Sequence, residues 1–303
     1  MKHYVLSCSI SLLAASLLLP AAAGAGLPEP AYPRTRQLIS LVEKAAARIE
    51  RDGDLAFTEF RNKDSQWFSG DTYIFVNDTK GICLVNPAEP EMQGTSIADF
   101  RDADGKPVFS LGLAATAGPD HRGWIHYLWP KPGQTKPVWK SSFLIRVTAP
   151  SGTDYIVGSG LYDSPTERLF IAQTVDQAAA LIKKEGRDAF PTLRSKAGPF
   201  LYGDTSVFVF DGHGTDLVSP DRPELEGQNV LDLKDADGNY IVRNIMSLLK
   251  DTDSGWISYS WPRLGQTEPA HKTSFVRKFE LKGDTLYLGA GLYRDTADET
   301  AAD

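Results

Sequence analysis

Two segments of the chain carry aromatic side chains in the same arrangement, and a lysine follows each segment at the same distance. One segment reads GWIHYLWP from Gly123, and the other reads GWISYSWP from Gly255. Side chains alternate between the two faces of a strand, so the tyrosine and the last tryptophan of each segment share one face. Aromatic walls with polar tips suit a small polar ligand, and a lysine ammonium suits its carboxylate. The candidate binding residues are therefore Tyr127 and Trp129 in the first segment with Lys140 after it, and Tyr259 and Trp261 in the second segment with Lys272 after it.

These residues also have ordinary structural interpretations. Aromatic side chains fill cores and sheet faces, and a lysine on a strand is usually exposed. Recurrence in two copies keeps the binding interpretation open beside the structural one. Trp67 and Tyr73 are two further candidates, as selectivity positions, because Phe200 and Ser206 stand opposite them in the second copy. Ordinary divergence of a core after duplication is the alternative there.

The two segments belong to a duplication that covers most of the chain. A repeat this long indicates a duplicated domain, because solenoid units run to about 20–50 residues. Each copy has the size of an ordinary domain, about 100–150 residues, and can bury its own core. The pairs that define the duplication are Gly70-Asp71-Thr72 with Gly203-Asp204-Thr205, Asp102–Gly105 with Asp235–Gly238, and Gly158–Tyr162 with Gly289–Tyr293.

The N-terminus has the composition of a secretory signal. Lys2 and His3 precede the apolar run Ile10–Leu19, and small residues follow up to Gly26. The run is too short to span a bilayer as a helix. We expect cleavage near Ala23–Ala25 and a periplasmic or secreted mature protein; an uncleaved anchor is the alternative. The net charge of −7 argues against nucleic acid and an anionic membrane surface as partners.

Helical and strand periodicities follow each other in the same order in both copies. An apolar helical period over 36–51 predicts a long first helix, with Thr35 as its N-cap and Gly53 as its end. The short loops between the strands that follow favour antiparallel sheets and an α+β class. The predicted division is a signal peptide over 1–26, domains over 27–165 and 166–296, and a disordered acidic tail over 297–303.

In its ordered set of motifs, each copy resembles a single Cache domain, an extracellular small-molecule sensor module related to PAS folds. The resemblance covers nearly all of the chain after the signal. It implies two tandem PAS-like domains, each an antiparallel sheet with a long N-terminal helix and flanking short helices. The matching positions of the first copy are Gly70–Tyr73, Asp78, Gly81, Pro87, Asp102–Gly105, Gly123–Pro130, Lys140 and Gly158–Tyr162. Those of the second copy are Gly203-Asp204, Asp211, Gly214, Pro220, Asp235–Gly238, Gly255–Pro262, Lys272 and Gly289–Tyr293.

The resemblance implies a pocket for a small ligand, often a short carboxylate, between each sheet and its flanking helices. Family members usually carry a transmembrane helix and a chemoreceptor, kinase or cyclase output, whereas this sequence has two copies and no output segment. It also departs from the family pattern at Asn86 and Ser219, where a His often precedes the Pro, and at Ser206 and Ala290 in the second copy.

Two functions of different classes remain open. The first is a periplasmic sensor that binds a small polar ligand and acts through a membrane-bound receptor or kinase. The second is a structural or assembly module whose duplicated sheets serve protein contacts. The sequence has no nucleophile elbow and no zinc-ligand spacing, and its DADG turns lack EF-hand ligands at the first and twelfth loop positions. We therefore expect a non-enzyme without cofactor or metal.

Overall fold

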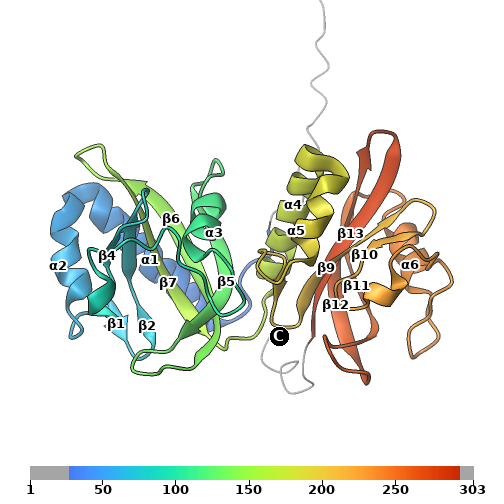
Figure 1. The fold of residues 1–303 in the computed structure, drawn as a ribbon, viewed down its shortest axis with the longest axis horizontal. Helices are drawn as coiled ribbons and strands as arrows, with labels where there is room; N and C mark the ends of the chain where they lie inside the picture. Colours follow the sequence, from blue (N-terminus) through green and yellow to red (C-terminus); the bar gives the residue numbers. More distant parts are fainter. Residues whose placement is uncertain (1–26, 294–303) are drawn as a thin grey trace, which may run out of the picture.

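The computed structural model describes residues 27–293, so the predicted signal peptide and the tail 297–303 lie outside the described residues. Two α+β units follow each other along the chain (Figure 1); the first has a main antiparallel sheet of five strands, and the second has one of six strands, in which the short β8 pairs with β9. The expected α+β class with two tandem domains is confirmed. From residue 27 to residue 293, no helix is both long enough and apolar enough to span a bilayer.

Each unit starts with a long helix and ends with three long strands. The first contains α1 (Pro33–Asp52), η1 (Gly53–Leu55), α2 (Ala56–Arg61), β1 (Phe68–Ser69), β2 (Thr72–Tyr73), β3 (Phe75–Asp78), β4 (Cys83–Val85), η2 (Pro90–Met92), α3 (Val108–Ala115), β5 (Arg122–Pro130), β6 (Pro137–Thr148) and β7 (Asp154–Tyr162). The second contains α4 (Arg168–Glu185), η3 (Gly186–Ala189), α5 (Phe190–Arg194), β8 (Leu201–Tyr202), β9 (Thr205–Asp211), β10 (Asp216–Val218), η4 (Pro223–Leu225), α6 (Ile241–Leu248), β11 (Ser254–Pro262), β12 (Pro269–Leu281) and β13 (Asp284–Tyr293).

The strands have the same order in both sheets. The first sheet runs β4-β3-β7-β6-β5 and the second runs β10-β9-β13-β12-β11. The antiparallel register places Lys140 of β6 between Tyr127 of β5 and Tyr162 of β7. Lys272 of β12 lies in the same way between two tyrosines, Tyr259 and Tyr293. Each sheet therefore carries a lysine with a tyrosine directly opposite on either side.

The long first helix begins earlier than the sequence pattern predicts. Tyr32 is its N-cap, and Pro33 occupies the first helical position. A proline suits that position because its missing N–H would have no partner there and its φ is already helical. Thr35 lies buried inside the helix, so its predicted role as N-cap is wrong. Gly53 ends the helix with a φ of 58°, as predicted, in a conformation that favours glycine.

Each sheet has a long helix on one face, and a short helix together with the pocket on the other face. In Figure 1, α1 lies on one face of the first sheet and α3 on the other, and α4 and α6 flank the second sheet in the same way. Trp124 of β5 joins the core under α1, whereas Tyr127 and Trp129 join the cluster on the opposite face with α3. The predicted alternation along this strand is confirmed.

The two units pack directly against each other through the edge strand β5. Trp124 contacts Phe170 of α4 with ring centroids 4.6 Å apart. His126 stacks on Tyr202 of β8 at 3.9 Å. The core under α1 therefore continues into the second unit. The domain limits 27–165 and 166–296, and the independent folding of each half, stay predictions that expression of each half tests.

A buried lysine adds a polar contact to this interface. Lys106 has no exposed surface, and its Nζ donates to the carbonyl of Gly198 and, at 2.7 Å, to that of Leu201. Both carbonyls belong to the loop and strand that lead into the second sheet. Burial lowers the pKa of Lys106 to about 8, against the opposing charge of Asp102. At pH 7 the folded state is therefore less stable with Lys106 protonated than it would be with the uncharged form of the side chain.

We predict that Lys106 makes the protein more stable as the pH rises from about 8 to 10.5. A lysine with a lowered pKa in the folded state contributes its full stability above its ordinary pKa of 10.5, and loses that contribution as the pH falls through 8. Relative to Lys106→Met, the wild type should gain at most roughly 3 kcal/mol of unfolding free energy across this window. Urea unfolding at several pH values measures the difference. The exposed-lysine variant Lys136→Met should track the wild type, and a pH-independent gap between Lys106→Met and the wild type would contradict the prediction.

Candidate ligand-binding sites

The lysine of the first sheet is buried, with 1% of its surface exposed. Its Nζ donates to the hydroxyl of Tyr73 at 2.9 Å and lies 4.7 Å from the ring centroid of Tyr162. Tyr162 donates to the carbonyl of Pro130 at 3.0 Å, so the Tyr73 hydroxyl donates to Tyr162 across 3.3 Å. The interpretation of Lys140 as an exposed strand lysine is therefore wrong. The ammonium lies inside the domain, at the end of a directed chain of hydroxyl groups.

No negative charge is paired with this ammonium within residues 27–293. Burial raises the pKa of Tyr127 and of Tyr162, so both hydroxyls are neutral at pH 7. Glu89 lies close enough for the Lys140 charge to affect its pKa; it is half-buried and receives a hydrogen bond from Asn86 at 3.3 Å. Burial raises the pKa of Glu89, and Lys140 opposes that rise. An ammonium has three donors, and Tyr73 uses one of them.

A small cavity of about 50 Å³ adjoins this lysine. One water needs about 10–15 Å³ of such space, so the cavity has room for a few heavy atoms. The indole Nε1 of Trp129 is buried here without a hydrogen bond of normal geometry; a weaker interaction with Glu89 lowers the pKa of that carboxyl. A buried donor without an acceptor is costly. The lining includes Tyr73, Phe75, Asn86, Phe100, Val108, Tyr127, Trp129 and Lys140.

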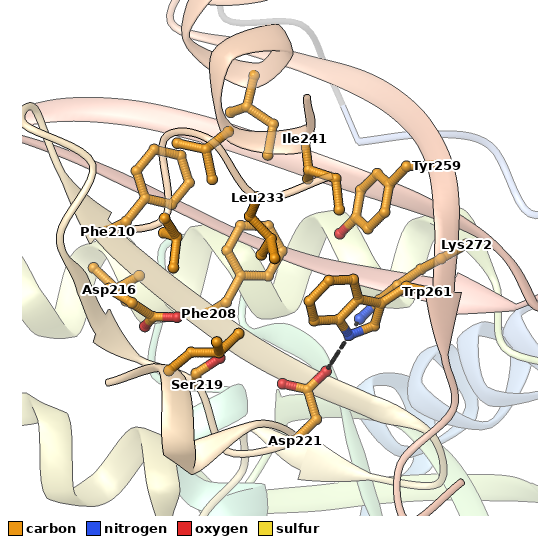
Figure 2. A pocket seen from close by; sticks show the side chains of 15 residues that line it. Phe208, Phe210, Asp216, Ser219, Asp221, Leu233, Ile241, Tyr259, Trp261 and Lys272 are labelled. Atoms are coloured by element: carbon orange, nitrogen blue, oxygen red, sulfur yellow. Dashed lines mark hydrogen bonds and ion pairs between the residues drawn. The ribbon is translucent and has the colours of Figure 1, made fainter. Parts of the chain in front are cut away.

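The second unit has a cavity of the same size in the same place, about 50 Å³ (Figure 2). Lys272 is again 1% exposed. Here, however, the indole Nε1 of Trp261 donates to Asp221 at 3.0 Å, and Lys272 lies 3.6 Å from the same carboxylate oxygen. Tyr259 donates to or accepts from Ser274 at 2.9 Å, as Tyr127 does with Ser142 in the first unit.

The structure brings together seven of the eight residues predicted from the sequence. Tyr73, Tyr127, Trp129 and Lys140 line the first cavity, and Tyr259, Trp261 and Lys272 line the second. Trp67 lies elsewhere: its ring packs edge-on against Phe60 at 4.8 Å in the core under α1. Sequence reasoning missed Asp216 and Asp221 of the second cavity. A comparison of the two copies for changes of charge, rather than for matching residues, would have identified both aspartates.

Room for each lysine stem is provided by a glycine on the next strand. A Cβ added at Gly160 would lie 2.5 Å from Cε of Lys140 and 2.5 Å from Oγ of Ser142. In the second sheet, a Cβ at Gly291 would lie 2.7 Å from Cε of Lys272. Such approaches are shorter than any normal contact, so the recurring Gly-x-Gly-Leu-Tyr motif lets the lysine cross the face of the strand.

We predict that Gly160→Ala displaces Lys140 and destabilises the fold. The added methyl group overpacks a buried site, which costs roughly 1–3 kcal/mol. Gly118→Ala is the matched control, because nothing lies within 4 Å of a Cβ at that position. Equilibrium unfolding in urea measures both variants. An unfolding free energy of Gly160→Ala equal to that of Gly118→Ala would show that the space under the lysine is not required.

Comparison with known proteins places the fold in a family. The Cache domain family dCache_2 matches residues 62–167 and 175–303. The methyl-accepting chemotaxis protein McpP of Pseudomonas putida is 34% identical over 109 residues, 36% of this chain and 19% of that protein. The sensor histidine kinase MctS of Rhizobium johnstonii is 33% identical over 95 residues, 31% of this chain and 20% of that protein. The matched segment thus spans about a fifth of the length of both relatives.

A similar solved structure is a Cache chemosensory domain described for its recognition of carboxylic acids. It is 26% identical, with a TM-score of 0.37, and the match covers 43% of this chain and 94% of that one. The family match extends over both units and over most of the chain. The expectation drawn from the motifs is confirmed, and the chain belongs to the Cache domain family.

Proposed function

We propose that this chain is a periplasmic sensor whose first domain binds a small carboxylate. The observation that carries the proposal is a pair of unsatisfied donors in one small cavity. The Lys140 ammonium has no ion pair within residues 27–293, and the Trp129 indole has only a weak interaction with Glu89 in place of a hydrogen bond of normal geometry. A carboxylate supplies the negative charge that the first requires and the acceptor that the second requires.

The cavity favours a short ligand. Its volume of about 50 Å³ suits a carboxylate of two or three carbons such as acetate or propionate. Phe75, Phe100 and Val108 give it apolar walls for the alkyl end. A charge-assisted hydrogen bond contributes roughly 1.5–3 kcal/mol, and it is stronger where water is excluded.

The output of such a sensor is proposed from its relatives. McpP is a chemotaxis receptor and MctS is a sensor kinase, and the stretch similar to this chain is a small part of each. We infer that this chain presents its liganded state to a membrane-bound partner of one of these kinds. The expected signal peptide supports a periplasmic location. A purely structural module would have no use for uncompensated donors in a cavity, so we rank that alternative second.

We predict that Lys140→Met weakens the binding of acetate and propionate by roughly ten- to a hundredfold, since each tenfold is about 1.4 kcal/mol. The variant keeps most of the stem and loses the charge. It should remain folded, because methionine fills most of the space of the lysine stem. Titration calorimetry and thermal unfolding measure the two effects.

The exposed-lysine variant Lys136→Met serves as the control and should bind as the wild type does. The proposal fails if Lys140→Met is folded and binds these acids as tightly as the wild type. It also fails if the wild type binds neither acid nor any other small carboxylate.

A further inference from the structure

The second pocket differs from the first in charge. Its lining includes Asp216 and Asp221, at positions where the first copy has Cys83 and Ala88. Lys272 is present in it as the counterpart of the first lysine. The lining of the second pocket thus carries two carboxylates and one ammonium, whereas the lining of the first carries one ammonium and no carboxylate.

Asp221 makes the contacts that a ligand carboxylate would make in the first pocket. Its side chain is 9% exposed, and one of its oxygens receives the Trp261 indole N–H and pairs with the Lys272 ammonium (Figure 2). In the first pocket the counterparts of these donors are Lys140, which has no ion pair, and Trp129, whose indole has only a weaker interaction with Glu89. The second domain therefore holds an anion of its own in the place of the ligand anion.

A second change accompanies this one. Tyr73, which accepts the hydrogen bond of Lys140, corresponds to Ser206 in the second copy. Lys272 has therefore exchanged a neutral hydroxyl partner for a carboxylate. Burial lowers the pKa of Lys272, and Asp221 opposes that effect. Asp221 already compensates the charge of Lys272. A carboxylate ligand would therefore gain little from the lysine and would be repelled by Asp221.

Asp216 has no cationic partner in the described part of the chain, although Ser219 and the backbone of Val218 hydrogen-bond to its carboxyl group, and burial raises its pKa to about 6. It is 7% exposed, and its Oδ1 is buried without a hydrogen bond. Figure 2 shows its carboxylate turned into the pocket beside Ser219. The rings of Phe208 and Phe210 line the same space. A carboxylate together with aromatic faces suits a small ammonium ion, through charge-assisted hydrogen bonds and cation–π contact.

We propose that the second pocket excludes carboxylates and takes a small ammonium-bearing ligand, with Asp221 in the place of a ligand carboxylate and Asp216 as the partner of the ammonium. The exclusion of carboxylates rests on the proposed function, because it is judged against carboxylate binding in the first pocket. The ammonium site is argued from the residues of the second pocket alone and does not depend on the proposed function. The two domains of one chain would then report on ligands of opposite charge.

The exclusion is tested by exchanging the two residues between the domains. In the full-length chain labelled with ¹⁵N, the indole N–H resonances of Trp129 and Trp261 report on each pocket separately, once assigned with Trp→Phe variants. On titration with acetate, the wild type should shift Trp129 and leave Trp261 unmoved. Asp221→Ala should make Trp261 respond, with a dissociation constant within about tenfold of that of the first pocket. Ala88→Asp should weaken the response of Trp129 at least tenfold.

Asp251→Asn is the matched control, because it removes an exposed carboxylate outside the pocket; its Trp261 resonance should stay unmoved by acetate. A wild-type Trp261 resonance that saturates with acetate overturns the exclusion. So does an Asp221→Ala or an Ala88→Asp protein that is folded but behaves as the wild type does. Failure of the proposed function has a different signature, a Trp129 resonance that does not respond in the wild type.

The ammonium site is tested with ethylammonium chloride by titration calorimetry on the full-length chain. We expect the wild type to bind it, and Asp216→Asn to weaken the binding at least tenfold. Asp251→Asn removes an exposed carboxylate and should bind as the wild type does. Lack of binding to the wild type, or equal binding to folded Asp216→Asn, overturns the proposal.

Discussion

Both domains of this chain are arranged around a lysine ammonium buried at the middle of a sheet. Withdrawing an ammonium from water costs several kcal/mol unless charges or hydrogen bonds replace the water. Lys140 has a single hydroxyl and two tyrosine rings in that role, whereas Lys272 has a carboxylate. Other features follow from this constraint. A glycine on the next strand makes room for the stem, and the register sets a tyrosine on either side.

After duplication, the two domains compensate the charge of the buried lysine in different ways. The first leaves its ammonium and an indole N–H incompletely satisfied, and under the proposed function the carboxylate of a ligand would complete both. The second satisfies the same two donors internally through Asp221, and adds a carboxylate of its own at Asp216. The shared backbone makes the comparison direct, because the lysines, tyrosines and tryptophans occupy the same register positions in both sheets. A few side-chain changes therefore suffice to alter the charge of a pocket without altering the fold.

The sequence predicted the fold and most of the site because both depend on local alternation and on recurrence. Tyr127 and Trp129 fall on one face by strand period alone. Strand period cannot say whether that face is covered, so the burial of Lys140 depends on how α3 and the loop after β4 pack over it. Trp67 lies in a short irregular segment, where no period indicates a direction. Asp216 and Asp221 were missed because acidic residues near strand ends usually face solvent.

Strand β5 joins the first pocket to the second domain. Tyr127 and Trp129 on one of its faces line the pocket, and Trp124 and His126 on the other pack against α4 and β8. A close-packed strand cannot shift on one face without disturbing the other. Burial lowers the pKa of His126 to about 3, so its stack on Tyr202 stays uncharged across the physiological range. A movement of β5 on ligand binding would therefore disturb its contacts with α4 and β8.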